Sequence, residues 1–149
     1  TEYGYEFGTA GSRMTDLGAA LPRIRARWAA VNPPPTRQIP VLIGGGGERK
    51  TLRVVAEHAT VWHSFGDVET FTRKSAVLDR WCAEVGRDPG EIERSVGVGS
   101  TGVPGQDAEA LRAAGVSLFT VDTTGPDYDL TRLTAWLSWR DQHNSGAPA

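Results

Sequence analysis

The sequence contains, at residues 39–51, the segment Ile39-Pro40-Val41-Leu42-Ile43-Gly44-Gly45-Gly46-Gly47-Glu48-Arg49-Lys50-Thr51. Its apolar first part is typical of a buried strand, and a helical pattern begins directly after the four glycines. A strand, a glycine loop and a helix N-terminus together direct backbone N–H groups and the positive end of a helix dipole toward one point. Glycines also let a ligand approach the bare backbone. The segment therefore predicts a phosphate-binding corner, with a tight turn that binds nothing as the alternative.

Two well-known phosphate motifs do not fit this corner. The dinucleotide motif G-x-G-x-x-G would need its third glycine at Arg49 or Lys50. The Walker loop needs a glycine directly before the Lys50-Thr51 pair, where this chain has Arg49. What remains is a barrel-type phosphate site, in which loops after parallel strands hold the phosphate against a helix start. Arg49 and Lys50 would add positive charge to such a site.

Composition narrows the classes of protein to consider. The 149 residues suffice for one domain with a hydrophobic core, and the formal net charge of -2 gives no electrostatic basis for binding nucleic acid or an anionic membrane. No apolar run approaches the roughly 20 residues of a membrane span, and the single cysteine cannot form an internal disulfide. No cluster of side chains has metal-ligand or hydrolase spacing. We therefore expect a soluble, cytoplasmic protein without a metal site.

Helical and strand patterns alternate along the chain. We expect helices at 15–31, 48–58, 67–85, 107–114 and from Asp129 onward, and a helical turn at Asp88-Pro89. The first of these helices should have Thr15 as N-cap and a kink or restart at Pro22, and the third should lie between Asp67 and Gly86. We expect strands at 39–43, 60–63, 95–98 and 116–121. Residues 1–14 look irregular and 145–149 frayed. Alternating strands and helices imply an α/β fold with a parallel sheet and right-handed crossovers. Because an eight-stranded barrel takes about 250 residues, four strands supply half of one at most.

Short segments with a shared resemblance run along nearly the whole chain. They are Tyr3-Gly4, Phe7-Gly8, Ile24-Arg25-Ala26-Arg27-Trp28, the glycine segment from Pro40 to Gly47, Thr51-Leu52-Arg53, Glu84-Val85-Gly86-Arg87-Asp88-Pro89, Tyr128-Asp129-Leu130 and Trp136-Leu137-Ser138-Trp139-Arg140-Asp141. In this order and spacing they resemble the luciferase-like monooxygenase superfamily, and within it the actinobacterial F420-dependent oxidoreductases.

The resemblance implies that residues 1–149 form a single partial-barrel domain, the C-terminal half (about four βα units) of a (β/α)8 TIM barrel. Members bind reduced deazaflavin (F420) or FMN at the carboxyl ends of the strands and transfer hydride to or from a small organic substrate. Carried over by position, the family pattern implicates Gly44, Gly45, Gly46 and Gly47, with Arg49 and Thr51, in binding the cofactor phosphate. Trp62 and His63 stand where the family usually has Trp-Asn, facing the barrel mouth.

Each of these two side chains has a plainer alternative role. His63 could donate to a cofactor carbonyl or act as an acid or base, or it could make a purely structural hydrogen bond. Trp62 could line an apolar ring pocket or belong to the barrel core. No other catalytic residue is identified.

Five further side chains are assigned roles outside the candidate site. We expect Cys82 to be a buried inert thiol, His58 to interact with the carbonyls at its helix end, and His143 to be exposed. Trp136 and Trp139, three residues apart, should not both face the core, so one of them could mark an interface.

The chain also departs from the family pattern. The first four strands are absent, and Thr60 and His63 replace the usual Asp and Asn. A half barrel has two open sheet edges and an uncovered inner face, so we expect it to pair with an N-terminal barrel half or to self-associate. Three functions stay open: half of an F420-dependent oxidoreductase, an FMN-dependent monooxygenase of the same superfamily, or a non-catalytic half-barrel assembly module.

Overall fold

The structure is a computed structural model, and it describes residue 4 and residues 6–98, 102–123 and 125–144. The predicted frayed tail at 145–149 lies outside these residues, as does part of the predicted irregular segment at 1–14.

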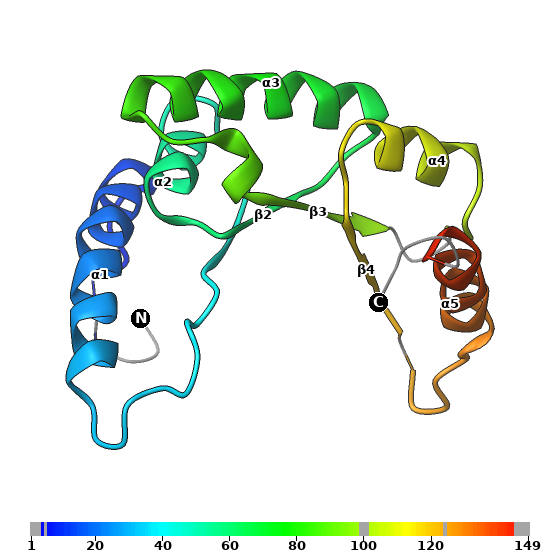
Figure 1. Cartoon of the computed structure of the whole chain (residues 1–149), viewed down its shortest axis with the longest axis horizontal. Coiled ribbons are helices and arrows are strands. Elements are labelled where there is room, and N and C mark those ends of the chain that lie inside the picture. The colour runs from blue at the N-terminus through cyan, green and yellow to red at the C-terminus, as the bar shows by residue number, and fades with distance from the viewer. Residues whose placement is uncertain (1–3, 5, 99–101, 124, 145–149) are drawn as a thin grey trace.

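Helices and strands alternate through the described residues, as predicted. Their bounds are α1 (Ala10–Ala30), β1 (Leu42–Gly44), α2 (Thr51–His58), β2 (Val61–Ser64), α3 (Val68–Val85), the 3-10 helix η1 (Pro89–Glu91), β3 (Glu93–Val98), α4 (Gln106–Ala113), β4 (Leu118–Val121) and α5 (Thr131–Asn144). The four strands form one parallel sheet in the order β1-β2-β3-β4. The helices arch over one face of this sheet, from α1 at one end to α5 at the other (Figure 1). This is the architecture expected of half a TIM barrel, and it confirms the predicted fold class.

The two faces of the sheet differ sharply. Trp62 of β2 stacks on Phe71 of α3, with ring centroids 5.6 Å apart, and therefore points to the helices. Side chains alternate along a strand, so its neighbour His63 points to the opposite face, which we call the inner face. Leu42, also on the inner face, is 53% exposed. The hydrophobic core thus lies between sheet and helices, and the inner face is open.

Packing of α2 on α3 supplies the centre of the core. Leu52, Val55, Phe71, Leu78 and Cys82 are all fully buried there. Burial raises the pKa of the Cys82 thiol, which keeps it protonated, so the predicted buried thiol is confirmed.

The ends of α3 are also as predicted. The Asp67 side chain accepts a hydrogen bond from Thr70 N at 2.8 Å, and Gly86 ends the helix in the left-handed conformation with φ 70°. Val85, the last residue of the helix, is 37% exposed.

The first helix begins earlier than predicted. Thr9, not Thr15, is its N-cap, because Thr9 and Ser12 exchange side chain to backbone hydrogen bonds in a capping box. The irregular segment therefore ends before residue 10. The helix runs through Pro22 without restarting, and of its predicted apolar face only Leu21 is buried.

Several other boundaries differ from the prediction by a few residues. Strand β1 begins only at Leu42, α2 begins at Thr51 after a turn, β4 begins at Leu118, and α5 begins at Thr131. Strand β3 is longer than predicted and begins at Glu93. Its first two residues are charged, so the apolar pattern in the sequence did not indicate this start.

The last helix packs differently from the prediction. Both Trp136 and Trp139 contact Phe119 of β4, with ring centroids 5.3 and 5.4 Å away, so the two indoles do face the same neighbour. Leu130 and Leu137 are 51% and 40% exposed. The large indole rings reach β4 where the shorter leucines do not.

His143 is also placed differently from the prediction. It is half-buried rather than exposed: Nε2 lies 2.9 Å from Glu109 Oε1, and Nδ1 lies 2.7 Å from the carbonyl oxygen of Trp139. Glu109 also accepts from Trp139 Nε1 at 2.6 Å, which ties α4 to α5.

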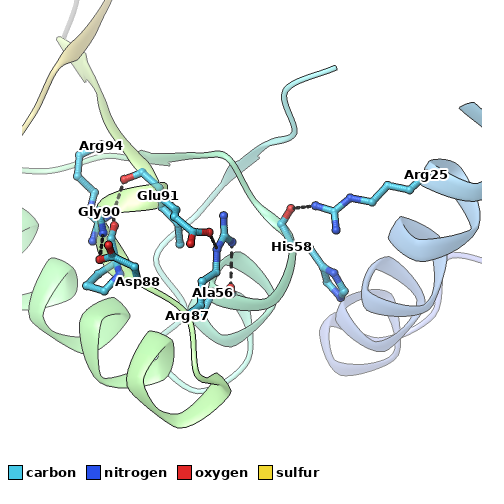
Figure 2. Close-up of polar contacts among 10 residues, drawn as sticks. Arg25, Ala56, His58, Arg87, Asp88, Gly90, Glu91 and Arg94 are labelled. Carbon is cyan, nitrogen blue, oxygen red and sulfur yellow. Dashed lines mark hydrogen bonds and ion pairs between the residues drawn. The ribbon is translucent and has the colours of Figure 1, made fainter. Parts of the chain in front are cut away.

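Arginines hold the amino edge of the sheet together (Figure 2). Arg25 of α1 donates to the His58 carbonyl, and Arg87 donates to the Ala56 carbonyl at 3.0 Å. The carbonyls at the end of α2 are thus bound by two guanidinium groups, not by His58 as predicted. Desolvation lowers the pKa of His58, and the Arg25 and Arg87 charges lower it further, against the opposing effect of Glu57.

Arg94 of β3 is the one buried arginine among the described residues, with 9% exposure. Its guanidinium donates to Asp79 Oδ1 at 2.7 Å and to the Pro89 carbonyl at 3.0 Å, and also to the Ile92 carbonyl. It therefore joins α3, η1 and β3.

We predict that Arg94→Ala lowers the free energy of unfolding by about 3 kcal/mol, because it removes charged hydrogen bonds and orphans buried carbonyls. Asp79→Ala should cost about 1 kcal/mol, since Asp79 is half-exposed and Arg94 keeps its carbonyl acceptors. Urea unfolding of both variants measures the difference. Equal losses would show that the ion pair, not the carbonyl contacts, carries the effect.

We also predict a pH dependence from His58. Its pKa is lowered on folding, so below the unfolded value of about 6.5 the unfolded chain binds more protons than the folded chain. Stability contributed by the neutral ring is therefore present above pH 6.5 and is lost as the pH falls toward the lowered folded pKa. Urea unfolding at pH 7.5 and 5.5 should show a smaller loss for His58→Gln than for wild type. The same loss in both proteins would contradict this assignment.

Candidate functional site

The glycine corner, Gly44–Gly47, lies at the carboxyl edge of the sheet, where β1 ends. Gly44 pairs in register with His63 at the end of β2, and Gly45 N donates to the His63 carbonyl at 3.0 Å. Ligands bind at this edge in parallel α/β sheets. The corner and His63 therefore lie side by side at this edge.

Local packing explains why glycine stands at these positions. Gly45 has φ 126°, a backbone conformation that side chains strongly disfavour. A Cβ at Gly45 would stand 3.2 Å from Thr51 Cγ2, and one at Gly47 would stand 2.7 Å from Thr51 Oγ1. Thr51 thus fills the space beneath the corner and supports its shape. At Gly44 a Cβ would meet nothing within 4 Å, so space next to His63 is open.

The start of α2 leaves backbone donors available. Its N-cap residue, Lys50, forms no side-chain capping bond, whereas Thr9 caps α1 and Asp67 caps α3. In the structure as described, the N–H groups from Gly46 to Lys50 make no hydrogen bond, while Leu52 N reaches back to the Gly47 carbonyl at 3.0 Å. These amides are the kind of donor that binds an anion at a helix N-terminus.

Helix α3 holds the outer side of the corner. Trp81 Nε1 donates to the Glu48 carbonyl at 2.7 Å, and Arg73 forms an ion pair with the Glu48 carboxylate. Lys74 reaches over Gly46, where its ammonium occupies the place that a Cβ would take. No acidic side chain among the described residues pairs with Lys74.

Lys74 is the residue that sequence reasoning missed. It lies in the second turn of α3, in an Arg73-Lys74 pair of the kind usually solvated on a helix surface. Only the packing of α3 against the loop before α2 brings it to the corner. A sequence signal would have been the βαβ order itself, which places neighbouring helices side by side.

The corner gathers positive charge without an anion to balance it. Lys74 joins the positive end of the α2 dipole, where a cation is unfavourable, whereas the Lys50 ammonium lies against Gly11 of α1. Arg73, by contrast, is neutralised by Glu48. Such a cluster is favourable once an anion such as a phosphate enters it.

Arg49 lies apart from the glycines. Its side chain lines a groove between α1 and α2 with Met14, Gly18 and Glu57. A role for Arg49 in binding a cofactor phosphate stays a prediction, and the available group at the corner is its backbone N–H.

Trp62 supports the corner from within the core. It has no exposed surface, and its Nε1 donates to the Gly45 carbonyl at 2.8 Å. Of the two roles left open by the sequence, this geometry matches the core residue, because a fully buried ring presents no surface to a ligand. Its indole fixes the orientation of the Gly44–Gly47 backbone.

His63 is on the inner face, half-buried, next to the open space at Gly44. Its Nδ1 lies 2.8 Å from Ser95 Oγ on β3, and the exposed Phe65 packs edge-on against it with ring centroids 4.7 Å apart. The site as a whole therefore combines free backbone donors, an unpaired lysine and an imidazole at one edge of the sheet.

The luciferase-like monooxygenase family profile matches residues 7–143. This chain belongs to the luciferase-like monooxygenase family. Members of this family use flavin or F420 cofactors, and the family indicates an oxidoreductase or monooxygenase activity. A search of curated proteins returned no match.

Two further classes of site find no support in the structure. Across the described ranges, no group of three or more His, Cys, Asp or Glu side chains could hold a metal ion. No described helix is long and apolar enough to cross a membrane.

We predict that Gly45→Ala lowers the free energy of unfolding by about 1–3 kcal/mol, because alanine is strained at this φ and its Cβ would press on Thr51. Gly44→Ala is the matched control, since its Cβ would meet nothing, and it should change stability by less than about 0.5 kcal/mol. Thermal and urea unfolding compare the two. Equal stability of both variants would show that the corner is not held in the conformation described.

Proposed function

We propose that this chain is the cofactor-phosphate-binding half of an F420-dependent oxidoreductase that transfers hydride between the deazaflavin and a small organic substrate. The observation that carries the proposal is the glycine corner, with free amides and Lys74 at the carboxyl edge, in a member of a family that uses flavin or F420. The cofactor would supply the hydride chemistry. The protein needs to anchor it, orient its ring and exclude water.

The residues present divide these tasks between two places. The amides of Gly46–Lys50 and the Lys74 ammonium would bind a phosphate, through backbone donors and one mobile charge. The space beside Gly44 would admit the cofactor next to His63, whose imidazole would contact the ring. Thr51 and Trp62 would act beneath the corner by supporting its backbone.

FMN is the alternative cofactor. The glycine corner interacts only with the phosphate, which both cofactors carry, so the corner favours neither. An FMN-dependent monooxygenase of the same superfamily is therefore the second candidate function.

We also propose that a partner covers the open parts of the sheet. Strands β1 and β4 each lack a neighbour on one side, and all four residues of β4 are partly exposed. Leu42 on the inner face is 53% exposed, where a closed barrel would bury it. An N-terminal barrel half or a second copy of the chain would complete the sheet. If completion restores no cofactor binding, a non-catalytic assembly module is the remaining function.

A cofactor titration with a matched lysine pair tests the proposal. The protein is titrated with F420 and with FMN, and binding is followed by the fluorescence of each cofactor. Riboflavin and the deazaflavin without its phosphate-bearing side chain are the phosphate-free compounds for comparison. Lys74→Met should weaken binding of both phosphorylated cofactors about tenfold and leave the phosphate-free compounds unchanged, because a charged hydrogen bond is lost. Lys50→Met is the control, since its ammonium lies against Gly11 of α1 rather than over the corner.

The titration is run on the chain alone and with an N-terminal barrel half supplied, and light scattering records which assembly is present. Tighter binding of F420 than of FMN supports the first candidate, and the reverse supports the second. Equal affinity for the phosphorylated cofactors and the phosphate-free compounds would contradict the proposed role of the corner.

A further inference from the structure

His63 and Ser95 are neighbours on the inner face. They are paired in register on the parallel strands β2 and β3, so their side chains point to the same side of the sheet. His63 Nδ1 lies 2.8 Å from Ser95 Oγ, and Ser95 is fully buried. A buried hydroxyl has one proton to donate, and donating it to an acceptor within reach is favoured over leaving it unpaired.

The hydroxyl proton has a single place to go. Throughout the described part of the chain, Ser95 Oγ makes no hydrogen bond other than the one to His63. If the ring nitrogen donated to Oγ, the hydroxyl proton would be buried without an acceptor. If the hydroxyl donates to Nδ1, both groups are satisfied. In the neutral ring Nδ1 is then the acceptor, and the proton is on Nε2.

The position of Nε2 gives this tautomer a consequence. Nε2 points toward Gly97, two residues nearer the carboxyl edge than Ser95, and lies 3.4 Å from where a Cβ at Gly97 would stand. Phe65 packs against the imidazole with the two ring planes at 83°, and its ring also lies beside Gly97. The imidazole is thus held by Ser95 at Nδ1 and by the Phe65 ring, and its Nε2–H is directed toward Gly97 on the inner face.

We propose that Ser95 is a positioning residue that fixes His63 in the Nε2–H tautomer. Its consequence is that the site accepts, at this nitrogen, a ligand atom that is a hydrogen-bond acceptor, such as a carbonyl oxygen of the cofactor ring. Only that consequence rests on the proposed function, because the tautomer is a property of the chain without ligand.

A second buried serine provides a matched control. Ser64 is 1% exposed and follows His63 directly, so it points to the helices rather than the inner face. Its Oγ has no hydrogen-bond partner among the described residues. Ser64→Ala therefore removes an equally buried hydroxyl, from the neighbouring position, without touching His63.

Nitrogen NMR of the histidine side chains at pH 8 tests the proposal directly. The chain has three histidines, and His63→Gln assigns the signals. In wild type we expect Nδ1 of His63 to resonate as an unprotonated ring nitrogen and Nε2 as a protonated one. Ser95→Ala should convert this pattern to a mixture of both tautomers, while Ser64→Ala should leave it unchanged.

If Ser95→Ala does not fold, the pair Ser95→Thr and Ser95→Val replaces it, because the two differ only in the hydroxyl. The threonine variant should keep the Nε2–H pattern and the valine variant should lose it. A protonated Nδ1 in wild type, or an unchanged pattern without the hydroxyl, would overturn the proposal. Cofactor titration of the same variants is read separately: failure to bind either cofactor would reject the proposed function and leave the tautomer result standing.

Discussion

The parallel pairing of β1 with β2 at its last residues is the constraint on which the site depends. Gly45 N donates to the His63 carbonyl, and Trp62 Nε1 donates to the Gly45 carbonyl, so the backbone on both sides of Gly45 is fixed by β2. One strand therefore orients the glycine corner through a buried indole and presents an imidazole on its other face. The free backbone donors of the corner and the imidazole are held at a set separation because two adjacent residues of β2, Trp62 and His63, position both.

The elements with strong local signals could be predicted from the sequence. Helix α3 is bounded by Asp67 and by Gly86 in a left-handed conformation, and both signals are local to the chain. The glycine corner could also be predicted, since a run of four glycines is unfavourable in a strand or a helix. Boundaries failed where two signals of similar strength compete: Thr9 and Thr15 can both cap a helix, and only the reciprocal bonds with Ser12 select Thr9.

Much of the candidate site could not be predicted, because it is made by tertiary neighbours. Lys74 reaches the corner through the packing of α3 against the loop before α2, and Ser95 reaches His63 through strand register. Neither depends on spacing along the chain. Trp62 shows a different limit: in a sheet covered by helices, alternation separates two faces but does not say which is the core. The burial of Arg94 could not be predicted either. An arginine is assigned to a loop or to the surface unless its carbonyl acceptors are known.

The two edges of the sheet are treated differently, and this contrast is the strongest physical argument for a ligand. At the amino edge Arg25, Arg87 and Arg94 bind backbone carbonyls at the ends of α2 and η1. At the carboxyl edge the opposite is found: α2 begins without a side-chain cap, its N-cap is a lysine, and a second lysine lies over the corner. A serine, threonine or aspartate at the N-cap would stabilise α2 by about 1 kcal/mol, as such residues do at α1 and α3. Stability alone therefore does not account for an uncapped corner with Lys74 over it, whereas an anion that neutralises Lys74 and accepts from the free amides does.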